Sequence, residues 1–141
     1  WANPVANGRP YPGHTELFAR ADAVLVMLGE ASIDAALESH PTVGGRPGSA
    51  HSRFEQCAVW DDDPSVMAEI TRSVRAYEQR FGFRYLWCPG GRSPDELLAD
   101  VLHRLGNDAD AERKVRTDEL AKVTRTRLER MLGPEDGFPL F

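Results

Sequence analysis

The sequence contains only two cysteines, Cys57 and Cys88, among 141 residues. Two thiols make neither a disulfide framework nor a zinc knuckle, so we expect both to be buried or half-buried in a reducing compartment. Long apolar runs are also missing. The longest, from Ala21 to Leu28, is interrupted by Asp22 and is far too short to cross a bilayer. We therefore expect no membrane association.

Basic residues are outnumbered: 17 Lys and Arg against 22 Asp and Glu give a net charge of -5. This balance argues against a general nucleic-acid binder, which needs a basic face. No Gly-rich phosphate loop follows a strand and no βαβ pattern is present, which argues against the common nucleotide enzymes. No signal peptide or peroxisomal address is recognisable, so we expect a cytoplasmic protein. Because the chain starts at Trp1 rather than Met, we also expect sequence to precede it.

Apolar residues recur at intervals of three and four positions through most of the sequence, which predicts amphipathic helices. Asp63-Pro64 and Ser93-Pro94 each place a capping side chain before a proline at the first helical position. Residues 1–13 are rich in Pro and Gly and predict an irregular lead-in. The predicted helices run from an N-cap at Thr15 to Gly29, from an N-cap at Ser32 to His40, and over about 50–60, 64–81, 94–106 and 108–132.

One short stretch, from Phe83 to Cys88, is aromatic and apolar without a helical period. Since no second good strand is present to pair with it, we predict a single extended segment in the core. Its backbone amides around Leu86, Trp87 and Cys88 would then lack sheet partners. The sequence as a whole predicts one compact all-α domain over residues 1–141, with about six or more helices and this one extended segment.

The residues best suited to chemistry lie between 40 and 56. His40 is held at a helix end by the following Pro41, and a Gly-rich loop leads from it to the next helix. On that helix Ser52, Glu55 and Gln56 are spaced i, i+3, i+4 and share one face. A carboxylate beside an imidazole orients it and tunes its pKa, as a general acid or base requires. The pattern favours acid–base chemistry, although a solvated helix face would have the same composition.

Other interpretations of these residues are weaker. The four histidines show no paired ligand spacing on one helix, so the sequence predicts no metal site. A Ser-His-Glu hydrolase would lack the strand-turn-helix elbow that exposes a nucleophilic serine at Ser52. Near the end of the last helix, Arg127 adjoins the apolar side and could reach into a pocket to bind a carboxylate. Arg125 and Arg130 are expected at the surface.

Five motifs occur in a particular order along the chain: His40-Pro41-Thr42-Val43-Gly44, Ser52-x-x-Glu55-Gln56, Tyr77-Glu78-x-x-Phe81-Gly82-Phe83, Arg104-Leu105-Gly106-Asn107 with Glu112, and Lys122-Val123-x-x-x-Arg127-Leu128. In their order and spacing they resemble the 2-oxo-4-hydroxy-4-carboxy-5-ureidoimidazoline (OHCU) decarboxylases, which act at the end of the route from urate to (S)-allantoin. The Gly44–His51 loop is shorter than in many relatives, and it places His51 directly beside Ser52.

The resemblance implies an all-α homodimer that needs no metal or organic cofactor and takes OHCU as its small-molecule substrate. It implies that His40 is the catalytic acid or base and that Glu55 is its partner. Substrate binding would fall to Pro41, Ser52, Gln56 and Arg127, and to backbone amides near Leu86 and Trp87.

Two other function classes are compatible with the same residues. The chain could be an all-α binding or scaffold module, in which the region of His40 and Glu55 packs against a partner. It could also be a hydrolase of a related ureido or lactam substrate that uses the same polar residues. An enzyme needs a closed polar pocket on which these side chains converge, whereas a binding module would expose an apolar groove.

Overall fold

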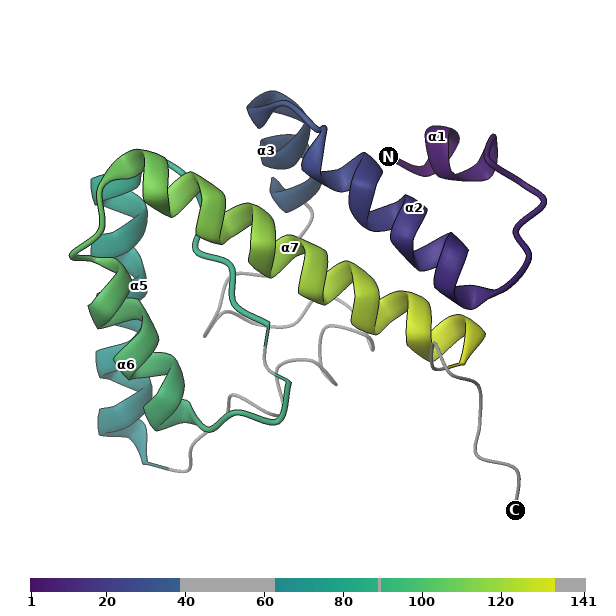
Figure 1. Ribbon diagram of the computed structural model, residues 1–141. Coiled ribbons are helices and arrows are strands. Elements are labelled where there is room, and N and C mark those ends of the chain that lie inside the picture. Colours follow the sequence, from purple (N-terminus) through teal and green to yellow (C-terminus); the bar gives the residue numbers. More distant parts are fainter. Residues whose placement is uncertain (39–62, 89, 134–141) are drawn as a thin grey trace, which may run out of the picture.

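The computed structural model describes residues 1–38, 63–88 and 90–133. Within these ranges the chain is helical and has no strand, which confirms the predicted all-α class (Figure 1). No helix there combines the length and apolar character that crossing a membrane requires. The helices are α1 (Ala2–Ala6), α2 (His14–Val26), α3 (Glu30–Glu38), α5 (Pro64–Phe81), α6 (Pro94–Arg104) and α7 (Ala109–Leu132).

The helices form two groups joined by α7. Helices α5 and α6 pack side by side, while α2 lies along α7 and carries α1 on its other side (Figure 1). The linker between α5 and α6 passes behind α7 in this view and contains the extended segment 83–88. This segment therefore lies between the two groups of helices.

The strongest start signals in the sequence are confirmed. Asp63 Oδ1 accepts a hydrogen bond from Ser65 N (2.8 Å) at the start of α5, with Pro64 in the first turn. Ser93 and Glu96 form a reciprocal capping box at the start of α6. At the other end of α5, Gly82 has a φ of 74°, a left-handed conformation that suits glycine.

Weaker boundary signals were wrong. Helix α2 begins at His14 after Gly13, so Thr15 lies inside the helix rather than capping it. Helix α3 already begins at Glu30, which likewise places Ser32 inside a helix. Residues 2–6 form the short helix α1 where an irregular lead-in was predicted, with Val5 buried against α2. For α1, the burial of Val5 against α2 favours a helix that the local composition does not predict.

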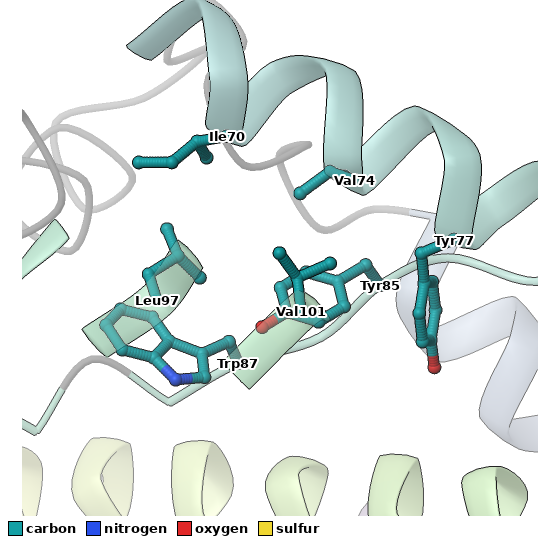
Figure 2. Close-up of a cluster of buried hydrophobic side chains, with 7 residues drawn as sticks. All are labelled: Ile70, Val74, Tyr77, Tyr85, Trp87, Leu97 and Val101. Carbon is teal, nitrogen blue, oxygen red and sulfur yellow. The ribbon is translucent and has the colours of Figure 1, made fainter. Parts of the chain in front are cut away.

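The first hydrophobic cluster lies between α5, α6 and the extended segment (Figure 2). Ile70, Val74 and Tyr77 come from α5, and Leu97 and Val101 come from α6. The extended segment adds Tyr85 and Trp87, which Figure 2 shows pointing into the same cluster. The ring of Tyr77 lies edge-on to that of Tyr85, with 5.0 Å between centroids.

A second cluster lies on the opposite side of the extended segment. Leu86 and Cys88 pack there with side chains of α2, α3 and α7, which are Leu25, Ile33, Leu37, Leu120 and Val123. Alternate residues of the segment thus point to opposite sides, as the period of two in extended backbone requires. The prediction of an extended segment in the core is confirmed, and it joins the two clusters.

A buried polar network ties α5, α6 and α7 together. The Glu112 carboxylate is fully buried and accepts from Arg104 Nε (2.6 Å), the Tyr77 hydroxyl (2.5 Å) and Asn107 Nδ2 (2.9 Å). Burial lowers the pKa of Arg104, but the hydrogen bond with Glu112 and the neighbouring groups outweigh it and leave the pKa raised. One of the five motifs, Arg104 to Asn107 with Glu112, is therefore structural in this fold.

The first cluster yields a test of stability. Leu97 is completely buried in it, so Leu97→Ala should lower the free energy of unfolding by about 2–5 kcal/mol. Leu102→Ala on the same helix removes a side chain that is 52% exposed, and it should change stability by less than about 0.5 kcal/mol. Urea denaturation of the two variants checks the contrast. Equal losses would show that the core is not where the structure places it.

A second test uses alkaline pH. Burial and a hydrogen bond to Glu112 raise the pKa of Tyr77, and burial and a hydrogen bond to Asp100 raise that of Tyr85. Above about pH 10 the unfolded chain loses these protons while the folded chain keeps them, so stability falls as pH rises. Each tyrosine contributes a slope of about 1.4 kcal/mol per pH unit, and the buried thiol of Cys88 adds the same sign at slightly lower pH. Urea midpoints between pH 9 and 11 should decline less steeply in Tyr85→Phe than in the wild-type protein, and equal slopes would contradict the account.

Candidate active site

The predicted site residues fall into two sets. His40, Pro41, Ser52, Glu55 and Gln56 all lie in the range 39–62, outside the described residues. Leu86, Trp87 and Arg127 are described, and they come from the extended segment and from α7. The described part of the candidate site therefore consists of residues from these two elements.

Charged side chains satisfy the backbone of the extended segment where it enters the core. Glu78 Oε1 accepts from Tyr85 N (3.3 Å), and Arg104 Nη1 donates to the carbonyl oxygen of Leu86 (2.8 Å). An extended segment without a sheet partner needs such bonds, because unpaired buried backbone groups are costly. The segment is fixed here by α5 and α6.

At its other end the segment is held by Glu119 of α7 and by Arg92. Glu119 Oε2 accepts from Cys88 N (2.6 Å), and Arg92 Nη2 donates to the Cys88 carbonyl oxygen (2.5 Å). Arg92 also approaches Glu119 to 3.3 Å, and its guanidinium stacks over the Trp87 ring at 4.5 Å from the centroid. The amide of Cys88 lacks a sheet partner, as predicted, but the Glu119 side chain occupies it, so it is not available to bind a ligand.

The amides of Leu86 and Trp87 differ from that of Cys88. Neither N–H has a hydrogen-bond acceptor among the described residues. The indole Nε1 of Trp87 is buried and likewise has no acceptor in that part of the chain. Two adjacent backbone donors and one side-chain donor are therefore available in a rigidly held stretch. Because adjacent N–H groups of extended backbone point in opposite directions, a given ligand oxygen could meet only one of the two amides.

Cys88 is not placed to act as a nucleophile. Burial raises the pKa of its thiol, and a hydrogen bond with Thr126 offsets this only in part. A thiol with a raised pKa stays protonated near neutral pH, and the protonated form is unreactive. The prediction that Cys88 is a buried thiol is confirmed. Cys57 lies outside the described residues.

Arg127 lies on the face of α7 that borders the extended segment. It follows buried Val123 by one helical turn and buried Leu120 by two, and both of those residues pack with Leu86. The neighbouring Thr126 contacts the Cys88 thiol. Arg127 itself is half-buried, as predicted for a residue at the edge of the apolar side.

The two arginines that flank Arg127 were both expected at the surface. Arg130 is exposed, as predicted. Arg125 is not: its side chain is 27% exposed, and its guanidinium stacks over the Phe18 ring at 4.5 Å from the centroid. It therefore fills the contact between α2 and α7, where its long side chain covers apolar surface.

A separate hollow of about 410 Å³ opens between α3 and the end of α5. Asp34, Phe83 and Arg84 are among its lining residues, but Leu86, Trp87 and Arg127 are not. It therefore contains none of the described residues of the predicted site. No group of three or more His, Cys, Asp or Glu side chains in the described ranges is placed to hold a metal ion.

Sequence reasoning missed the side chains that hold the segment. Glu119, Arg92 and Arg104 bind its backbone directly, yet in the sequence they look like ordinary charges on helices and loops. A signal was present, because a lone extended segment must find backbone partners elsewhere. Glu119 stands next to apolar Leu120, and Arg104 stands among the apolar residues of α6. A charged residue on the buried side of a helix indicates a side chain that can bond to such a segment.

Solved structures include a close match to this arrangement. A crystal structure of OHCU decarboxylase in the presence of (S)-allantoin superposes with a TM-score of 0.82, covering 94% of this chain and 90% of that one. The two sequences are 21% identical, so the likeness concerns the fold.

Curated relatives agree. A 2-oxo-4-hydroxy-4-carboxy-5-ureidoimidazoline decarboxylase from Amia calva is 29% identical over 135 residues, covering 91% of this chain and 77% of the relative. The uric acid degradation bifunctional protein TTL of Arabidopsis thaliana is 26% identical over 139 residues, covering 93% of this chain and 43% of that longer protein. The family model described as OHCU decarboxylase matches residues 1–129, and the chain therefore belongs to the OHCU decarboxylase family.

Proposed function

We propose that this chain decarboxylates OHCU and delivers (S)-allantoin in urate degradation. The observation that carries the proposal is the family match over residues 1–129. The relative from Amia calva bears the name of this activity, and the matching crystal structure was obtained with (S)-allantoin, the expected product. The whole chain would act as one domain.

The substrate sets the demands on the site. The carbon that loses CO2 carries a hydroxyl and adjoins the ring C=N carbon, which also bears the ureido group. When the carbon–carboxylate bond breaks, its electron pair forms a new bond to the ring carbon, and the C=N electrons move to nitrogen. The nitrogen takes up a proton, and the product is an enol-like intermediate. A second proton must then reach one face of the ureido-bearing carbon while the hydroxyl gives up its proton and becomes a carbonyl.

Two residues in the range 39–62 are proposed to handle the proton. His40 is the acid or base, and Glu55 orients the imidazole and supports its charged form. Pro41, Ser52 and Gln56 would contact the ring and the ureido group. Delivery of the proton from one fixed imidazole would explain a single enantiomer, because the substrate presents only one face to it.

The described residues support binding and orientation. Arg127, half-buried beside the extended segment, is proposed to grip a substrate carboxylate or carbonyl through charge-assisted hydrogen bonds. The amide of Leu86 or of Trp87, neither of which has an acceptor in the described chain, would bind a second oxygen. Glu119 and Arg104 hold that stretch of backbone in place, so the donors are preorganised for the substrate.

Three further properties are proposed. The family resemblance favours a homodimer that works without a metal or organic cofactor, and we also expect a cytoplasmic location. The C=N group of the substrate accepts the electron pair that the departing CO2 leaves behind. The substrate therefore supplies the electron acceptor that a cofactor would otherwise provide. General acid–base catalysis and electrostatic positioning then suffice for the reaction.

Two substitutions test the assignment of roles. With substrate freshly prepared from urate, His40→Ala should lower kcat by about 10²- to 10⁴-fold, because the proton carrier is lost. Arg127→Gln should lower kcat/KM by about 10- to 100-fold, because a charge-assisted contact is lost. For each variant, polarimetry measures the formation of allantoin and a second assay measures the released CO2. His103→Ala on the exposed side of α6 is the control and should leave both parameters unchanged.

Several outcomes would contradict the proposal. If the wild-type protein left the racemic spontaneous reaction unaltered, the activity would be wrong. Turnover without CO2 would point to a hydrolase of a related ureido or lactam substrate. If His51→Ala rather than His40→Ala abolished activity, the catalytic histidine would be misassigned.

A further inference from the structure

Arg116 on α7 is the largest of the fully buried side chains in the described chain. A charged group in such a place needs strong compensation, because a buried unpaired charge is very unfavourable. The proposed mechanism does not use it. Its contacts are with α3 and with the extended segment.

Arg116 binds two carboxylates of α3 at once. Its Nη1 lies 2.6 Å from Asp34 Oδ1, and its Nη2 lies 2.5 Å from Glu30 Oε2. Glu30 and Asp34 are spaced i, i+4, so they stand one above the other on the face of α3 that meets α7. A planar guanidinium can bridge two such groups with separate nitrogens. Because these two contacts lie one helical turn apart, the arginine restricts sliding of α3 along α7 as well as its separation from α7.

The same side chain also reaches the start of the extended segment. Its guanidinium carbon lies 4.2 Å from the centroid of the Phe83 ring. Arg116 therefore contacts α3 and the extended segment while belonging to α7. Ile33, which lies between the two carboxylates of α3 in the sequence, and Leu37, which follows them, belong to the second cluster with Leu86 and Leu120. One arginine joins three elements that approach the candidate site.

The position of α3 matters because the helix leads directly to the proposed catalytic histidine. It ends at Glu38, only two residues before His40. Arg127 stands on the same helix as Arg116, and Leu86 and Trp87 come after Phe83 in the extended segment. Whatever fixes α3 against α7 and Phe83 therefore also fixes Glu38, the helix end from which the chain continues to His40.

We propose that Arg116 is a positioning residue for the reaction, because it holds α3 through Glu30 and Asp34. A correctly held α3 would let His40 approach the substrate that Arg127, Leu86 and Trp87 bind. The inference rests on the proposed function, since it needs His40 to be the proton carrier. It assigns Arg116 no contact with substrate. Loss of Arg116 should therefore impair the proton step more than substrate binding.

The test compares Arg116→Met and Arg116→Lys with Arg113→Gln. Arg113 is a matched control, because it lies on the same helix and approaches Glu30 to 3.7 Å but is 44% exposed. A misplacement of about 1 Å can slow a reaction about 100-fold, so Arg116→Met should lower kcat by about that factor. Lysine keeps the charge but lacks the two separate nitrogens that contact Asp34 and Glu30, so it should rescue kcat only in part. Affinity for (S)-allantoin should stay near the wild-type value in all three variants.

Assays well below each melting temperature separate positioning from stability. A folded Arg116→Met protein with wild-type kcat would overturn the inference. A parallel loss of allantoin affinity and kcat would also overturn it, because the whole site would then have collapsed. If Arg116→Met does not fold, Asp34→Asn removes one of its partners at a side chain that is 54% exposed, and the same drop in kcat with retained affinity is expected. An inactive wild-type protein would instead refute the proposed function.

Discussion

The extended segment 83–88 is the constraint on which the rest of this fold depends. It passes through the core of an all-helical domain without a sheet partner among the described residues, so its peptide groups must find partners elsewhere. Glu78, Arg104 and Glu119 supply them from three different helices, and Arg92 supplies one from the loop after the segment. A buried peptide group left unpaired would cost about 1–3 kcal/mol, so these charges are required inside the protein.

This requirement explains why charged residues occupy the buried sides of α6 and α7. Arg104 both binds the segment and pairs with buried Glu112, and Glu119 is only 5% exposed. The segment's alternating side chains in turn join two hydrophobic clusters that would otherwise be separate. The same segment has a structural and a proposed functional role. The amides of Leu86 and Trp87 have no acceptor in the described chain, and one of them is proposed to bind substrate.

The sequence predicted the local features well. The starts at Pro64 and Pro94 followed from caps whose chemistry is complete within four residues, and the extended segment followed from composition. It did less well where distant residues decide. Thr15 is a good capping residue in isolation, but α2 begins earlier, and Arg125 is drawn over Phe18 by the contact of α2 with α7. The role of Glu119 depends on a partner 31 positions away, which no local pattern reveals. The roles of His40 and Glu55 came from the family resemblance and stay predictions.

The central claim is that residues from distant parts of the chain converge on one substrate site. A crystal structure of this protein with (S)-allantoin tests it most directly. The account predicts that the ligand lies against the extended segment, with hydrogen bonds to the amides of Leu86 or Trp87 and to Arg127, and with the His40 imidazole within hydrogen-bond reach of the ligand. Allantoin bound elsewhere, or His40 and Arg127 on separate surfaces, would contradict it.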